Sequence, residues 1–412
     1  MNATAWRVTL AAAALMALVA GGRGAFGLFV SPLNSASGIG LAKLSFALAL
    51  GQLAIGFAQP WVGALADRAG AARVIAIGAA AWALTTALPV AWADPWIVSA
   101  SVVLAALAGS AVASNGLLVG EVQRAVPAPR AGFAIGLVGA GTSMGLLLLG
   151  PLTQWAIDGW GWQVALFATA AACLLAWLLA PAFRRSPGQA PATPRQAVRD
   201  VLREWRFWRV ALSFGVCGFH VCFLAVHMPG VIERCGLPAS LAGIWVAVCG
   251  AANIAGSLAV GWAMRHVDHA RLLAGLYLVR ALGIVALLLL PATPAVMLGF
   301  AAVMGASFMA TLPPTSQLIA KAHGAERLGT LFGVVMLVHQ VGGFLGIWIG
   351  GWAAEATGSD LLLWSLDIAL ALLAAALVWP AVQRVRGDAR SDHGRSMLYT
   401  RSMQASPRKS AS

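Results

Sequence analysis

Long apolar stretches alternate with short polar segments along almost the whole chain. Twelve stretches have the length of a membrane-spanning helix, since roughly 20 apolar residues cross about 30 Å of hydrocarbon. They are Val8–Phe29, Leu44–Leu65, Val74–Ala93, Trp96–Gly120, Gly132–Trp155, Trp162–Phe183, Trp208–Ile232, Ser240–Met264, Leu272–Leu290, Ala295–Ala320, Leu328–Trp352 and Leu361–Val382. Inside a bilayer the backbone must satisfy its own hydrogen bonds. The pattern therefore predicts an all-α integral membrane protein with twelve transmembrane helices.

Basic residues lie almost entirely in every second gap between these stretches. If the N-terminus is cytoplasmic, 23 of the 27 basic residues fall on the cytoplasmic side, and only Lys43 and Arg234 fall outside. An excess of Lys and Arg marks the cytoplasmic loops of membrane proteins. We expect a multi-pass protein of the cell (inner or plasma) membrane with both termini in the cytoplasm.

Composition excludes two classes of protein. With 60% apolar and 10% charged residues, the chain has too little polar surface for a soluble globule. The net charge of +13 sits in short loops and in the tail, where it meets anionic lipid headgroups. We expect the lipid bilayer as the partner of these charges, and no nucleic acid.

Two pairs of related segments indicate an internal duplication. The segment Gly63–Arg73 is echoed by Gly261–Arg271, 198 residues later, and Arg130–Gly136 is echoed by Arg327–Gly333, 197 residues later. The long polar segment in mid-chain separates the copies. The predicted division is an N-terminal six-helix bundle (1–183), a cytoplasmic linker (184–207), a C-terminal six-helix bundle (208–383) and a disordered basic cytoplasmic tail (384–412).

The first of these segments, Gly-Ala-Leu-Ala-Asp-Arg-Ala-Gly-Ala-Ala-Arg, closely resembles the GxLADRxGxR signature of the major facilitator superfamily. The resemblance implies the fold of that superfamily and secondary transport by alternating access. It also implies a conformational latch on the cytoplasmic side, formed by Gly63, Asp67, Arg68, Gly70 and Arg73. The second copy has Arg265 in place of the acid, so we expect the latch in the first copy alone.

A finer resemblance concerns two helices. Arg23–Leu33, which closes the first stretch, and His339–Gly346 look like bacterial relatives of the monocarboxylate and oxalate–formate transporters. This likeness implies a carboxylate cargo. An exporter of neutral or amphipathic compounds, with an aromatic cavity lined by some of the 17 Trp, is the alternative.

Two arginines, Arg23 and Arg280, lie within the apolar stretches. A charge in the bilayer costs about 2.5–3.5 kcal/mol on insertion scales, so it needs compensation. The acid within a stretch, Asp367, is about two turns into the last one, and we expect it near the outer surface. Two cations without a carboxylate at depth predict binding of a small organic anion, a mono- or dicarboxylate. Alternatively, Arg23 snorkels to the outer interface and Arg280 pairs with polar groups of a neighbouring helix.

Polar residues inside the stretches suggest a path between the two bundles. Ser45, Gln52 and Gln59 share one face of a helix because they are seven residues apart. The candidates for polar recognition of the substrate are His220, Asn253, His339 and Gln340. The two histidines, near mid-depth, either bind a coupled proton or only donate hydrogen bonds. Closely spaced glycines such as Gly136, Gly139, Gly145, Gly333, Gly342, Gly346 and Gly350 predict close helix contacts.

The predicted function is secondary active transport of a small organic anion, with a coupled proton or an exchanged anion. We expect no enzyme activity, no cofactor and no metal, because no set of His, Cys and acidic residues has ligand spacing. A non-transporting membrane sensor on the same fold stays open as a distant alternative, as does a membrane-embedded enzyme.

Overall fold

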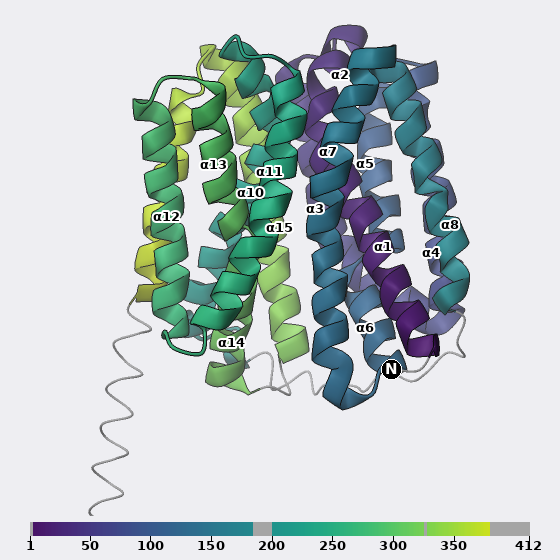
Figure 1. Ribbon diagram of the computed structural model, residues 1–412, viewed down its shortest axis with the longest axis vertical. Helices are drawn as coiled ribbons and strands as arrows, with labels where there is room; N and C mark the ends of the chain where they lie inside the picture. The colour runs from purple at the N-terminus through teal and green to yellow at the C-terminus, as the bar shows by residue number, and fades with distance from the viewer. Residues whose placement is uncertain (1–2, 184–199, 325–327, 380–412) are drawn as a thin grey trace, which may run out of the picture.

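A computed structural model describes residues 3–183, 200–324 and 328–379, which are helical almost throughout and contain no strand (Figure 1). The N-terminal half contains α1 (Ala3–Ala25), η1 (Phe26–Phe29), α2 (Val30–Ser37), α3 (Leu41–Ala69), α4 (Ala71–Ala91), α5 (Pro95–Val112), α6 (Asn115–Ala125), α7 (Ala128–Cys173), α8 (Leu175–Leu179) and η2 (Ala180–Phe183). The C-terminal half contains α10 (Trp205–Arg234), α11 (Ser240–Ala263), α12 (His269–Leu289), α13 (Pro294–Ser307), η3 (Met309–Thr311), α14 (Leu312–His323), α15 (Leu328–Thr357) and the last helix, Leu361–Trp379. Most of the predicted linker and all of the predicted tail lie outside the described residues.

Eleven continuous helical stretches of the described chain are long and apolar enough to cross a membrane. One of them, Phe133–Phe183, has 51 residues, about 76 Å of helix, and is long enough to cross twice. It turns at Gly161, whose φ of +84° is easy only for glycine and interrupts α7. The two arms correspond to the predicted stretches Gly132–Trp155 and Trp162–Phe183. The prediction of an all-α membrane protein with twelve crossings is confirmed.

The helices form two groups that lie side by side (Figure 1). In the N-terminal half, α1 packs along α7 and α4 packs along α5, while in the C-terminal half α10 packs along α15 and α11 along α13. Each half has an apolar cluster of its own, built mainly from small residues in the first and from aromatic and branched residues in the second, and a further cluster includes residues of both halves. The residue boundaries of the two bundles stay predictions.

The halves touch mainly through two helix pairs, α3 with α15 and α7 with α11, and also where η1 packs against α10. Glycines permit this approach: a Cβ on Gly351 of α15 would collide with Ser45 of α3, and one on Gly150 of α7 would lie 2.7 Å from Val246 of α11. These contacts involve residues 41–56 of α3 and 143–154 of α7. The halves are therefore closed against each other at the end of the bundle remote from the N-terminus.

At the other end the same helix faces are apart. Gly63 lies seven residues beyond Gly56 on α3, and Gly136 lies seven residues before Ser143 on α7, so each shares a face with the contact residues. Apart from the adjoining residues and backbone of the same helix, no described atom lies within 4 Å of a Cβ built on Gly63, Gly136, Gly139, Gly261 or Gly333. The predicted close contacts are confirmed for Gly145, Gly342, Gly346 and Gly350. They are wrong for Gly136, Gly139 and Gly333 in this conformation, because the helices diverge before they reach them.

Candidate functional site

Arg23 lies within a helical span that is longer than its apolar stretch. The helix does not end near Phe29 but continues through η1 and α2, so that one span runs from Ala3 to Ser37. Arg23 is consequently about 21 Å of helix rise from Ser37. The side chain is nonetheless exposed, although the adjacent Gly24 and Ala25 are buried.

The Arg23 guanidinium is held by amide groups. It donates a hydrogen bond to Oε1 of Gln52 on α3, and Gln52 Nε2 donates to Oε1 of Gln340 on α15 at 2.5 Å. Both glutamines are buried. Among the described residues, Arg23 forms no ion pair with a carboxylate. Arg23, Gln52 and Gln340 thus form a hydrogen-bonded chain that crosses from one half to the other and ends in a guanidinium with no carboxylate partner in the described part of the chain.

Arg280 has a different environment. It is fully buried inside the C-terminal half, and its Nε donates to Ser307 Oγ at 2.9 Å while one NH2 group donates to the Ser307 carbonyl at 2.5 Å. Its other NH2 group lies 3.4 Å from His220 Nδ1. Arg280 therefore pairs with polar groups of neighbouring helices, which was the alternative to its binding an anion.

The expectation that no carboxylate accompanies the buried cations is wrong for Arg280. Asp367 is fully buried, and its Oδ1 lies 2.9 Å from His220 Nε2. The sequence predicted its distance from the start of the last helix, about 9 Å of helix rise. It did not predict the face of the helix on which Asp367 lies. Trp364 and Ala371, three and four residues away on the same face, are buried too. That face turns Asp367 into the interior of the half instead of toward the surface.

Arg280, His220 and Asp367 compensate one another. The imidazole of His220 lies between them: its Nδ1 is 3.4 Å from the Arg280 guanidinium, and its Nε2 lies 3.2 Å from the backbone carbonyl of Asp367 and 2.9 Å from its Oδ1. Buried charges persist when they are paired in this way. This set, together with Ser307, satisfies Arg280 without any external anion.

The other two predicted residues lie elsewhere. Asn253, fully buried, donates from Nδ2 to Ser143 Oγ of α7 at 2.8 Å and accepts from the Met309 amide at 3.0 Å, so it joins the halves at the second contact. His339 is half-buried on α15, with its ring centroid 4.9 Å from that of Phe214. Its Nδ1 is buried and has no hydrogen-bond partner within the described part of the chain.

The segment predicted as a latch joins α3 to α4. Helix α3 ends at Ala69, Gly70 adopts a φ of +89°, and α4 begins at Ala71, so Gly70 makes the tight turn. Gly63 lies within α3, not in the turn. Arg68 and Arg73 are exposed, and the side chain of Asp67 lies outside the part of the chain that the structure describes.

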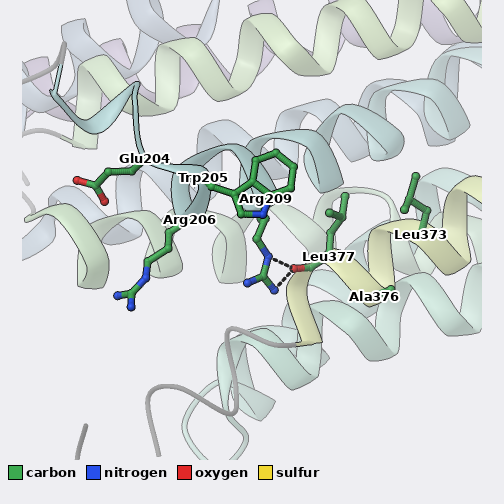
Figure 2. A pocket seen from close by; sticks show the side chains of 7 residues that line it. All are labelled: Glu204, Trp205, Arg206, Arg209, Leu373, Ala376 and Leu377. Atoms are coloured by element: carbon green, nitrogen blue, oxygen red, sulfur yellow. Dashed lines mark hydrogen bonds between the residues drawn. The ribbon is translucent and has the colours of Figure 1, made fainter. Parts of the chain in front are cut away.

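A surface pocket of about 580 Å³ lies apart from all these residues. Its lining comes from the start of α10 and the end of the last helix: Glu204, Trp205, Arg206, Arg209, Leu373, Ala376 and Leu377 (Figure 2). Arg209 donates from Nε and an NH2 group to the Leu377 carbonyl, at 2.8 and 2.5 Å. The pocket contains none of the predicted site residues.

The structure thus joins Arg23 to Gln340 and His220 to Arg280, and leaves Asn253 at a separate contact. Two residues were missed as site members. Gln52 was recognised only as part of a polar stripe, although that stripe does face α15. Asp367 was set aside by depth, although an acid within an apolar stretch is itself a signal of a buried partner.

Comparison with known proteins supplies the family. Residues 12–347 match the sequence profile of the Major Facilitator Superfamily. The chain is 24% identical to the uncharacterized MFS-type transporter YcxA of Bacillus subtilis (strain 168), with 86% of this chain and 90% of that protein covered. It is 26% identical to monocarboxylate transporter 13 of Rattus norvegicus, with 86% and 83% covered. Among solved structures, a bacterial homolog of the human lysosomal transporter Spinster, inward-facing and occupied, superposes with a TM-score of 0.75 at 16% identity, with 93% and 98% covered.

Proposed function

We propose that this chain, which belongs to the Major Facilitator Superfamily and is a secondary transporter of the membrane, carries a small organic anion of the mono- or dicarboxylate class by alternating access. The observation that carries the proposal is the state of Arg23. Its guanidinium is exposed, lies far from either end of its span and is bound to an amide instead of a carboxylate. The relatives named monocarboxylate transporters support the same class of cargo.

The energetic argument rests on charge compensation. A guanidinium within a membrane span costs free energy unless an anion or several acceptors offset it. One amide oxygen offsets it partly, whereas a carboxylate can bind the planar fork in a bidentate manner. Arg280 does not offer such a place, because its partners are already inside the protein. Arg23 is therefore our proposed anion contact, with Gln340 beside it and with His339 and Asn253 as further polar residues along the boundary between the halves.

We further propose that the open end of the bundle faces the cytoplasm, as does the N-terminus. The excess of basic residues in the loops at that end supports this orientation. The Spinster homolog with a similar fold is inward-facing, which agrees with it. A cargo would then reach Arg23 from the cytoplasmic side in the conformation described.

Counterflow in proteoliposomes tests the proposal. Vesicles holding the purified protein are loaded in turn with lactate, pyruvate, oxalate, malate and benzoate, then with sugars and cationic dyes, and uptake of the radiolabelled compound is followed. We expect counterflow with a carboxylate, and a loss of about 10- to 150-fold in Arg23→Ala, the equivalent of a hydrogen bond to a charged group.

The exposed Arg265→Ala serves as the matched control and should keep wild-type uptake. Counterflow with neutral or cationic compounds alone would reject the anion and favour the exporter of amphipathic compounds. Unchanged uptake by Arg23→Ala would remove Arg23 from the site.

The latch proposal, carried over from the family signature, concerns Asp67 with Arg68 and Arg73. Asp67→Asn removes the negative charge and keeps the shape of the side chain. We expect a turnover several-fold lower with binding of the carboxylate retained, measured by counterflow and by equilibrium binding on the same preparation. Normal turnover would exclude a role of Asp67 in the conformational cycle.

A further inference from the structure

Two glutamines meet where the halves are closed, and their surroundings are reciprocal. The side chain of Gln52 on α3 lies against Gly343 of α15, and that of Gln340 on α15 lies against Gly56 of α3. A Cβ on Gly343 would lie 3.1 Å from Gln52 Cγ, and one on Gly56 would lie 2.9 Å from Gln340 Cγ. Each helix therefore supplies one glutamine and the glycine that makes room for the other.

The carboxamide of Gln52 performs two tasks at once. Its Oε1 accepts from Arg23, and its Nε2 donates to Gln340 Oε1 across the boundary between the halves. One planar group in one rotamer makes both bonds, so whatever turns it away from Arg23 also turns it away from Gln340. Both glutamines are buried, so a lost bond between them would leave polar groups that need another partner.

We propose that an anion bound to Arg23 takes the place of the Gln52 amide oxygen and thereby releases the glutamine pair (Gln52 and Gln340), so that the loaded carrier opens its closed end more readily than the empty one. A carboxylate competes well for the guanidinium, because hydrogen bonds between two charged groups are roughly twice as strong as neutral ones. The inference rests on the proposed function, since it requires an anion at Arg23.

Transport kinetics distinguish release of the glutamine pair by an anion from a pair that only holds the two halves together. If the empty carrier is held closed while the loaded one is released, the protein exchanges anions faster than it transports them in net fashion. If the pair only joins the halves, its loss speeds or slows both processes alike. The residues Gln52 and Gln340 would thus set the ratio of exchange to net flux.

The variant Gln340→Leu tests whether the glutamine pair holds the empty carrier closed. Leucine fills a similar space but cannot accept the hydrogen bond from Gln52. Exchange is measured as counterflow, and net flux as efflux into anion-free buffer, with lactate or the first of the five carboxylates that gives counterflow. We expect the ratio of net efflux to exchange to rise about three- to tenfold, the range of a broken interhelical hydrogen bond.

The control is Gln154→Leu. Gln154 is also buried at a contact between the halves, where it packs against Gly243, but its Nε2 donates to Asp158 of the same helix at 2.8 Å. Its replacement should leave the ratio of exchange to net flux at the wild-type value. A ratio that changes equally in both variants would overturn the proposal.

A distance measurement gives a readout that does not need transport. Spin labels on K43C and A356C report the closed end, because the neighbouring Ala42 amide donates to Glu355 Oε2 at 2.6 Å. The exposed Cys235 is replaced by serine. We expect a short distance in the empty protein, and a longer one both after addition of the carboxylate and in Gln340→Leu without it.

The two proposals fail differently. If wild-type protein shows carboxylate counterflow but Gln340→Leu alters neither the distance nor the ratio, the release by the anion is wrong and the anion cargo stands. A second outcome is that Gln340→Leu lengthens the distance between the spin labels, while no carboxylate changes that distance or gives counterflow. The anion cargo is then wrong, and so is the release of the glutamine pair by an anion.

Discussion

The two arginines inside the membrane spans have the same charge and opposite surroundings. Arg280 is fully buried among Ser307, His220 and, through the imidazole, Asp367, all within the C-terminal half. Arg23 is exposed, lies at the boundary between the halves and has an amide as its hydrogen-bond acceptor. One charge is compensated by the fold and the other leaves room for an external anion.

The difference shows that a charge within a span is not by itself a binding site. Its partners decide the matter: a guanidinium with a carboxylate in its network stabilises a bundle, whereas one without a carboxylate can select a ligand. If this is right, the two arginines should respond to substitution in opposite ways, Arg280 through stability and Arg23 through transport.

The largest effect should follow Arg280→Met. It leaves Asp367 buried and uncompensated, so we expect a loss of about 3–5 kcal/mol in the free energy of unfolding. The matched Arg23→Met should lose only about 0.5 kcal/mol, as is usual for exposed positions. Thermal unfolding in detergent, followed by tryptophan fluorescence, compares them. Equal shifts in Tm would abolish the distinction between the two networks.

A second effect sharpens the assignment of Asp367 as the partner of Arg280. The double variant Arg280→Met with Asp367→Leu removes both charges, and apolar residues often replace a buried ion pair without loss. We expect unfolding to cost about 2 kcal/mol more than in Arg280→Met alone, although His220 loses its partners. A double variant as unstable as the sum of the singles would show that the two residues act independently.

The smallest of the three effects concerns the shape of the guanidinium at Arg23. Arg23→Lys keeps the charge but loses the planar fork, so the KM for the transported carboxylate should rise about tenfold, with Tm unchanged. The concentration dependence of counterflow measures it. A KM equal to that of the wild type would mean that Arg23 acts as a point charge only.

Much of the fold could be predicted from sequence because a bilayer leaves few choices. Runs of about 20 apolar residues must be helices there, and the alternation of basic loops orders them. What escaped prediction was local. The span that begins at Ala3 continues to Ser37 through polar residues such as Asn34, since a helix does not need to stop where its apolar stretch stops. The exact ends of helices carry no hydropathy signal of comparable strength.

The site could be predicted in its members but not in its connections. Arg23 and Gln340 were both candidates, yet 317 residues separate them, and only the packing of α3 on α15 brings them together through Gln52. Asp367 was misjudged because sequence gives the depth of a residue along one helix more readily than the neighbour it faces. Pairings between distant helices depend on their rotation, which a single sequence does not reveal.

The close approach of Gly343 to Cys222 has a practical consequence. A Cβ on Gly343 would lie 2.7 Å from the Cys222 sulfur and 3.1 Å from Gln52 Cγ, so a native thiol stands beside the glutamine pair. It is buried while the halves are closed, and buried thiols are slow to react. Opening at this end would admit a small alkylating reagent. Once the exposed Cys235 is replaced by serine, the rate at which Cys222 takes up one maleimide measures how often the protein opens at this end.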